Sequence, residues 1–217
     1  MFCNKNKINK NDFDGLRELA RSLVKEKRYA HILGVEQEAV KMAGIFGCDG
    51  NFIKKIKAAA LLHDITKEFD MQKQLEICGE YKIKLSGDDK KVPKSLHAKT
   101  GAYIAKLEFG ADDAVFNGIY NHTIGNASGA PGLFDKIIYL ADWIEPNRDY
   151  GDCCEVRDYF YSGIKAAANL SEKYIILDQT MLFSYNKSIE ALIKDNLFIH
   201  RDAVKHRNAL INRNITV

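Results

Sequence analysis

The stretch AAALLHDITK, residues 58–67, ends an apolar helical run in two adjacent side chains that can bind a metal ion. His63 offers a neutral ring nitrogen and Asp64 offers an anionic oxygen, with the second oxygen of the carboxylate free for a second ion. The alanines and leucines before the pair predict a packed helix, so both side chains should emerge from a core. Because an unpaired buried charge is costly, a metal ion would relieve it. The pair alone is weak support, since His-Asp also occurs by chance.

Helical periodicity extends from this stretch in both directions and predicts an all-α fold. Upstream, apolar residues recur at helical spacing after a helix cap at Asn11 and again over residues 29–46. The polar, glycine-containing segments 85–96 and 121–132 predict loops, and no alternating run is long enough to predict a sheet. The other predicted helices run from Gly50 toward His63 and over residues 70–80, 95–109, 112–120, 131–144 (opened by Pro131), 153–169 and 171–194, with a short helix after His200.

Length and composition favour a single domain and exclude several classes of protein. A chain of 217 residues can bury a full core as one domain. The net charge of +3, with lysines scattered or in short clusters typical of solvated faces, lacks the basic stripe of a nucleic-acid-binding protein. No apolar run approaches the roughly 20 residues that span a bilayer, and the N-terminal MFCNKNKINK lacks a signal-peptide core. Five cysteines, odd in number and without a CxxC pair, favour a reducing cytoplasm over a disulfide framework.

Four more side chains of metal-binding type accompany the pair, and each also has a structural explanation. His31 lies on an apolar helix face, where a lone histidine is often a hydrogen-bonded core residue, and Asp142 lies on a similar face. His97 and His122 stand at a helix start and a helix end, where capping would explain them. Together with the pair, they supply the nitrogen and oxygen ligands that an enzyme with two close cations needs. The joint pattern therefore favours a metal site.

Fixed positive charge stands near these candidate ligands, as phosphate chemistry requires. Lys67 follows Asp64 by three residues, which places both on one side of a continuing helix. Arg28 precedes His31 by three residues, and Arg148 lies six residues after the last candidate aspartate. Each of these cations is either a surface charge or a phosphate contact, and sequence spacing leaves both readings open.

The order of these residues resembles a known family signature. His31, the His63-Asp64 pair and Asp142 match the H…HD…D pattern of the HD superfamily of metal-dependent phosphohydrolases. More narrowly, the stretches HDITK, NHTIG and YLADWIEPNRDY resemble the bacterial symmetrical bis(5'-nucleosyl)-tetraphosphatases, over about residues 28–157. The sequence departs from that pattern at Ile124, where a second threonine is usual, and after Tyr150, where a proline is expected.

The resemblance implies a single HD-type domain over residues 1–217, an all-α helical bundle with a core of about 28–157 and additional C-terminal helices over about 158–217. It implies cleavage of diadenosine tetraphosphate into two ADP molecules with iron in the site. Manganese, cobalt or zinc suit the same ligands, and the sequence leaves open whether one or two ions bind. It also leaves open whether the chain forms a homodimer.

The resemblance further implies a role for each matching residue. The metal ligands would be His31, His63, Asp64 and Asp142. The catalytic residues would be His63, Asp64, Lys67, His97 and His122, the last two holding a second metal or contacting phosphate. The substrate would contact Arg28, Asp64, Ile65, Thr66, Lys67, His97, His122, Thr123, Asp142 and Arg148, with a weaker match over 185–190 for the nucleoside.

Several alternatives remain at this stage. The chain could be another HD phosphohydrolase, acting on a mononucleotide or a guanosine alarmone, or an iron oxygenase on the same scaffold. A non-catalytic sensor that binds ADP is an alternative from another class, although no candidate ligand is missing here. Product analysis separates the phosphohydrolases from one another, and oxygen consumption would reveal an oxygenase.

Overall fold

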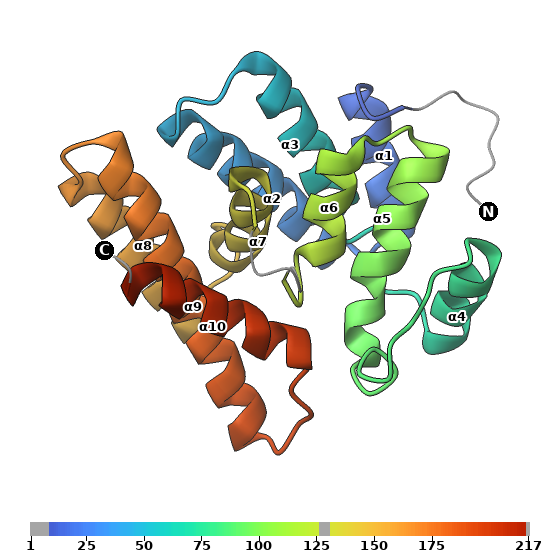
Figure 1. The fold of residues 1–217 in the computed structure, drawn as a ribbon. Coiled ribbons are helices and arrows are strands. Elements are labelled where there is room, and N and C mark those ends of the chain that lie inside the picture. The colour runs from blue at the N-terminus through green and yellow to red at the C-terminus, as the bar shows by residue number, and fades with distance from the viewer. Residues whose placement is uncertain (1–8, 126–130, 216–217) are drawn as a thin grey trace.

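The computed structural model describes residues 9–125 and 131–215, and over these residues it contains helices and no strand. This confirms the predicted all-α fold (Figure 1). No helix in the described part of the chain is long and apolar enough to cross a membrane. The helices are α1 (Phe13–Leu23), α2 (Glu26–Ile45), α3 (Gly50–Leu62), α4 (Met71–Glu80), the short 3-10 helix η1 (Pro93–Ser95), α5 (Leu96–Glu108), α6 (Asp113–Asn121), α7 (Leu133–Ile144), α8 (Gly151–Ala166), α9 (Leu170–Lys194) and α10 (Arg201–Ile215).

The core lies among α2, α3, α5, α6 and α7. Helix α2 packs along α3 and α7, α6 packs against α3, α5 and α7, and α1 covers α3. The apolar run of α3 is the centre of this core, because every side chain from Ala58 to Leu62 is buried. Alanine, leucine and lysine also have high helix propensity, so local preference and packing favour the same conformation in α3.

The predicted metal-binding pair lies in the turns that follow α3. An aspartate, Asp49, caps the start of the helix by accepting a hydrogen bond from the Phe52 backbone N–H. At the other end His63 keeps helical backbone angles, and the Lys67 N–H then closes a turn on the Asp64 carbonyl. His63 and Asp64 therefore remain buried in the core, although they lie after the end of α3.

The three C-terminal helices form a separate layer, seen in orange and red beside the core (Figure 1). Helix α9 packs against α7, α8 and α10, and α8 also packs against α7. The aromatic rings of Tyr139 in α7 and Tyr185 in α9 are stacked with their centroids 4.7 Å apart. This contact joins the C-terminal layer to the helix that carries Asp142.

Several predicted boundaries were wrong, each for a local reason. The cap of α1 is Asp12, whose carboxylate accepts from the Gly15 N–H, rather than Asn11. Pro131 does not open α7, which starts two residues later after Gly132. The last helix, α10, is not short, since it spans 15 residues from Arg201 to Ile215. Helices α2 and α8 also begin three and two residues earlier than expected, since tertiary packing extends helices beyond their apolar stripe.

Candidate metal centre

Five helices bring the six candidate side chains to one place. His31 lies on α2, His97 in the first turn of α5 and His122 just after α6. Asp142 lies near the end of α7, and the His-Asp pair follows α3. All four histidines and Asp64 are buried, whereas Asp142 remains partly exposed. A buried cluster that contains carboxylates needs a partner of positive charge.

One ligand group consists of His31, His63, Asp64 and Asp142. The His31 Nε2 lies 3.0 Å from Asp142 Oδ1 and 3.4 Å from His63 Nε2. The Asp64 Oδ2 lies 3.6 Å from each of these two histidine nitrogens. The ligand atoms of His31, His63 and Asp64 all lie within 4.8 Å of one another, and their donor types suit first-row divalent metals.

A second ligand group consists of Asp64, His97 and His122. The other oxygen of the same carboxylate, Asp64 Oδ1, lies 3.1 Å from His97 Nε2 and 3.7 Å from His122 Nε2. Those two ring nitrogens are themselves 3.1 Å apart. Asp64 thus stands between the two groups, with one oxygen toward each.

The backbone fixes which ring nitrogen of each histidine enters the cluster. His63, His97 and His122 each donate from Nδ1 to a main-chain carbonyl three residues earlier, at 2.6, 2.8 and 2.6 Å. His31 donates from Nδ1 to Glu145 Oε1 at 3.1 Å. Carbonyl and carboxylate oxygens can only accept, so the proton sits on Nδ1 and Nε2 presents a lone pair. Such outer contacts are typical of metal-binding histidines.

This arrangement fits a metal ion by its own chemistry. Pairs of Nε2 lone pairs face one another across 3.4 and 3.1 Å, and they also face carboxylate oxygens. Acceptors in such contact repel unless a cation or a proton lies between them. Asp64 Oδ1 is buried without a hydrogen-bond donor among the described residues. The donors, their orientation and this unpaired oxygen together support a metal centre.

The protonation states agree with that assignment. Burial lowers the pKa of His63 to about 3 and that of His97 to about 4, so both rings are neutral ligands at pH 7. Burial would raise the pKa of Asp142, but Arg148 outweighs it and holds the pKa well below its usual value. Burial is likewise outweighed at Asp64, whose pKa is held low by His63 and Lys67. Both carboxylates are therefore ionised at neutral pH.

His31 differs from the other rings because a carboxylate lies at each of its nitrogens. Burial lowers its pKa, but the contacts with Asp142 and Glu145 outweigh burial and raise it. In the absence of a metal ion, a proton on Nε2 would take the cation's place between His31 and Asp142.

Three cations that the sequence analysis singled out reach the cluster. Arg28 donates to Asp64 Oδ2 at 2.8 Å, and Arg148 donates to Asp142 Oδ1 at 2.7 Å. Lys67 donates to His97 at 3.1 Å and lies 4.0 Å from Asp64 Oδ1. Since Arg28 Nε is buried without a partner in the described part of the chain, this guanidinium retains a donor for a further anion.

The remaining predicted contacts divide into two kinds. Thr123 lies directly after His122, and its Oγ1 is buried without a hydrogen-bond partner among the residues described. Ile65 is fully buried in the apolar core, and the Thr66 hydroxyl donates to the His97 carbonyl at 3.1 Å. The side chains of Ile65 and Thr66 are therefore engaged in the packing and hydrogen bonding of the turn and the start of α5.

The sequence alone did not indicate two residues that hold parts of the site in place. Glu145 is 1% exposed and orients His31, and its Oε2 also accepts from the Asn147 N–H at 2.7 Å. Arg157 on α8 donates to three main-chain carbonyls, those of Ile144, Glu145 and Arg148, each within 2.7 Å. Only the quoted motif around residues 139–150 contained a signal for Glu145, whereas nothing local marked Arg157.

A basic cavity of about 370 Å³ opens beside the first ligand group. Its lining includes Arg28, His31 and Arg148, which adjoin the cluster, and the outer residues Lys25, Lys27 and Tyr150. This volume falls within the range of ligand pockets in enzymes.

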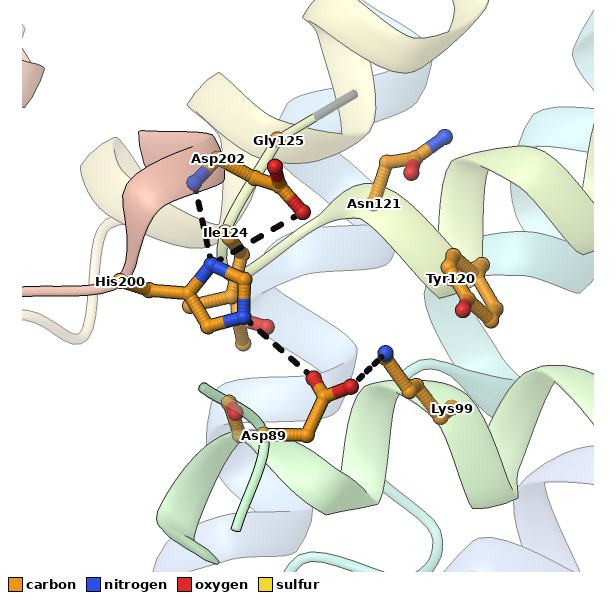
Figure 2. Close-up of a pocket in the computed structure, with 10 residues that line it drawn as sticks. Asp89, Lys99, Tyr120, Asn121, Ile124, Gly125, His200 and Asp202 are labelled. Carbon is orange, nitrogen blue, oxygen red and sulfur yellow. Dashed lines mark hydrogen bonds and ion pairs between the residues drawn. The ribbon is translucent and has the colours of Figure 1, made fainter. Parts of the chain in front are cut away.

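A loop cavity of about 190 Å³ lies on the side of the second ligand group, where the chain follows His122. Figure 2 shows that Asp89 stands at its floor between Lys99 and His200, with the loop residues Ile124 and Gly125 above them. The Lys99 Nζ lies 2.6 Å from Asp89 Oδ2, and His200 Nε2 lies 3.4 Å from Asp89 Oδ1. The start of α10 thus closes one wall of this cavity.

The chain is similar to several known proteins. The chain is 35% identical over 179 residues to the Bacillus subtilis (strain 168) protein named bis(5'-nucleosyl)-tetraphosphatase, symmetrical, covering 79% of this chain and 89% of that protein. A Staphylococcus aureus (strain NCTC 8325 / PS 47) protein of the same name is 33% identical over 183 residues, covering 81% and 90%. A crystal structure from Clostridium acetobutylicum, described as a predicted HD superfamily hydrolase involved in NAD metabolism, matches with a TM-score of 0.80 and 32% identity over 93% of this chain and 97% of that chain.

The family called HD domain matches residues 28–147, more than half of the chain. That span contains both ligand groups, Arg28, Lys67 and the histidine-orienting Glu145, and it ends one residue before Arg148. The matched region and the relatives agree with the order and the geometry of the ligands, and the chain therefore belongs to the HD domain family, in the group represented by the symmetrical bis(5'-nucleosyl)-tetraphosphatases.

Proposed function

We propose that the chain hydrolyses diadenosine tetraphosphate and related dinucleoside polyphosphates symmetrically, releasing two ADP molecules. One observation carries this proposal: a buried two-part ligand cluster with cations on its rim, in a chain whose relatives bear that activity in their names. The chemistry is hydrolysis of a phosphoric anhydride, and no side chain of the cluster needs to form a covalent intermediate.

Divalent metal binding accompanies the HD domain, and the ligand set here fits it. Metal ions held by these ligands would lower the pKa of bound water toward neutrality and would polarise a phosphoryl oxygen. We propose two ions, because Asp64 turns one oxygen to each ligand group, and iron as the natural metal. Imidazole and carboxylate ligands suit manganese, cobalt and zinc as well.

The cations on the rim bind and orient the phosphate chain. Arg28 and Arg148 each hold a ligand carboxylate with one nitrogen and keep further N–H groups for phosphate oxygens. Lys67 adds a point charge beside His97, and the unpartnered Thr123 hydroxyl can donate to a phosphate oxygen. Fixed charges of this kind stabilise the charge that builds up on the phosphoryl group during transfer.

The leaving group explains why the cluster needs no strong general acid. ADP leaves with a terminal phosphate whose second pKa is about 6, by analogy with other phosphate monoesters. His97 or His122 would supply a proton only where a single metal leaves one of them unbound. A substrate with two equal halves is cut at its centre when the pocket for one nucleoside sets its second phosphate at the cluster.

A reducing compartment suits this assignment. None of the four cysteines that the structure describes forms a disulfide, as expected for a cytoplasmic enzyme. The substrate is a small nucleotide, and we propose neither a nucleic-acid nor a membrane partner. A homodimer remains an open proposal, to be decided by the mass of the protein in solution.

Hydrolysis in oxygen-18 water tests the function. The purified, metal-loaded chain should convert diadenosine tetraphosphate into ADP alone, and mass spectrometry should find one heavy oxygen in one ADP of each pair. ATP plus AMP would refute symmetrical cleavage while leaving the metal centre intact. Rapid hydrolysis of a mononucleotide or of a guanosine alarmone, without turnover of dinucleoside polyphosphates, would assign the chain to another HD phosphohydrolase group. Tight ADP binding without any turnover would make it a sensor.

A further inference from the structure

The basic cavity carries positive charge on lysines that make no ion pair among the described residues. Lys25, Lys27 and Arg28 stand at the N-terminus of α2, where the positive end of the helix dipole disfavours cations by about 0.3–1 kcal/mol each. Lys25, the residue before the first helical turn, makes no side-chain cap contact. Arg28 pairs with Asp64, but the ammonium groups of Lys25 and Lys27 make no ion pair among the described residues, so their charge favours an anionic ligand in the cavity.

The carboxylates that line the same cavity are already engaged. Glu145 holds His31 and the Asn147 backbone, and Glu68 accepts a hydrogen bond from the Lys25 N–H at 2.8 Å. The cavity thus has more cations than carboxylates, and the exposed ammonium group of Lys27 makes no ion pair among the described residues. A polyphosphate chain leaving the cluster past Arg28 and Arg148 would meet this charge next.

The far side of the cavity carries an aromatic ring. Tyr150 is 56% exposed and directly precedes α8. The segment that carries it is firmly held, because Asn147 Nδ2 donates to the Ala30 carbonyl at 3.0 Å and Arg157 donates to the Arg148 carbonyl at 2.6 Å. An exposed ring on a fixed backbone is suited to stacking on a nucleobase.

We propose that the basic cavity binds the second nucleotide of the dinucleoside tetraphosphate, with Lys27 on its phosphates and Tyr150 stacked on its base. This inference rests on the proposed function and names the subsite for one half of the substrate. Arg28, His31 and Arg148 line this cavity, and the two arginines donate to the ligand carboxylates Asp64 and Asp142, so the cavity lies directly beside the cluster. A substrate with two nucleosides then has a place here for the half on this side of the cleavage point.

The test compares two substrates that differ by one nucleoside. Diadenosine tetraphosphate has both adenosines, whereas adenosine 5'-tetraphosphate has the same four phosphates and only one. For each variant of the full-length, metal-loaded chain, KM is measured for both compounds, with the inhibition constant replacing KM where adenosine tetraphosphate is not turned over. The readout is the KM for diadenosine tetraphosphate divided by the constant for adenosine 5'-tetraphosphate.

Tyr150→Ala should raise this ratio roughly 5- to 100-fold, the range expected from loss of one base-stacking contact. Tyr150→Phe, which keeps the ring, should recover most of that loss. Lys27→Gln should weaken both compounds by similar factors, because both carry the phosphates that the ammonium group contacts. The matched controls are Tyr159→Ala, an exposed tyrosine 42% accessible on α8, and Lys54→Gln, an exposed lysine on α3, and neither should change the ratio.

An equal effect of Tyr150→Ala on both compounds would overturn the inference, since the ring would then act on the common half or on the site as a whole. No effect of Tyr150→Ala on either compound would overturn it as well. Both outcomes leave the proposed function standing as long as the wild-type chain releases ADP. Failure of the wild type to cleave any dinucleoside polyphosphate would instead refute the proposed function itself.

Discussion

The carboxylate of Glu145 occupies the space that a side chain at Gly34 would fill, where α2 contacts the segment after α7. A Cβ atom at position 34 would lie 2.0 Å from Glu145 Oε2 and 2.7 Å from Asn147 Nδ2. Gly34 stands three residues after His31, so the missing side chain lets the carboxylate reach the ring that it orients. The glycine weakens a helix interior but gives a metal ligand its outer contact.

Gly34→Ala should therefore reduce metal affinity by roughly 10- to 100-fold, the usual effect of losing an outer contact of a ligand. It should also lower the free energy of unfolding by about 1–3 kcal/mol, since the added methyl group overpacks a buried site. Metal titration and urea denaturation measure the two effects separately.

Gly44→Ala is the matched control on the same helix. A Cβ there meets nothing within 4 Å, so this variant should keep its metal affinity and gain up to about 1 kcal/mol from helix propensity. Equal metal affinities for the alanine variants at positions 34 and 44 would show that Glu145 does not position His31.

Arg157→Lys should weaken the segment that carries Glu145 and Arg148. A lysine keeps the charge but cannot reach the three carbonyls that the guanidinium fork holds. Loss of charge-assisted hydrogen bonds at this position should cost about 2–3 kcal/mol of unfolding free energy. Hydrogen exchange of residues 144–150 should accelerate in this variant while exchange in α3 stays close to that of the wild type. Uniform acceleration along the chain would contradict a local role for Arg157.

The difference between the predicted and the missed residues has a physical basis. His63, Asp64 and the other ligands could be found from the sequence because their side-chain chemistry is itself the signal. Gly34 and Arg157 could not, because their roles depend on which backbone approaches them in the folded chain. A glycine in a helix and an arginine on an amphipathic helix look ordinary until that approach is known.

The helices show the same division. Apolar periodicity located the core helices, because the buried stripe of α3 or α7 is written directly in the residues. Their ends were less accurate, since the competition between Asn11 and Asp12 for a cap depends on small differences in backbone angle. The length of α10 was missed because it is anchored at its start by a distant loop, where Arg201 pairs with Asp88 at 2.8 Å.

Metal stoichiometry should separate the two ligand groups. The wild type should bind two ions per chain, Asp64→Ala should bind none tightly, and His97→Ala should retain one, because only the first ligand group keeps all its members. His63→Ala should lose the ion of the first ligand group and with it hydrolysis, while circular dichroism reports an unchanged helix content. Asp113→Asn, an exposed carboxylate on α6, is the control and should bind two ions. Full activity of Asp64→Ala would rule out the metal centre.

Arg148→Ala and Lys67→Ala should keep the metal yet slow turnover, each by roughly 10- to 1,000-fold if they stabilise charge in the transition state. The two residues reach different ligand groups, since Arg148 donates to Asp142 and Lys67 donates to His97. Neither provides a neutral nitrogen or an anionic oxygen to an ion, so metal content should stay at the wild-type level in both variants. Arg148→Lys should recover only part of the rate, because an ammonium group cannot hold Asp142 and a phosphate oxygen with one planar fork. Parallel measurement of metal content, ADP affinity and kcat decides the outcome: a variant that loses metal but binds ADP normally would show that its cation supports the ligands and not the phosphates.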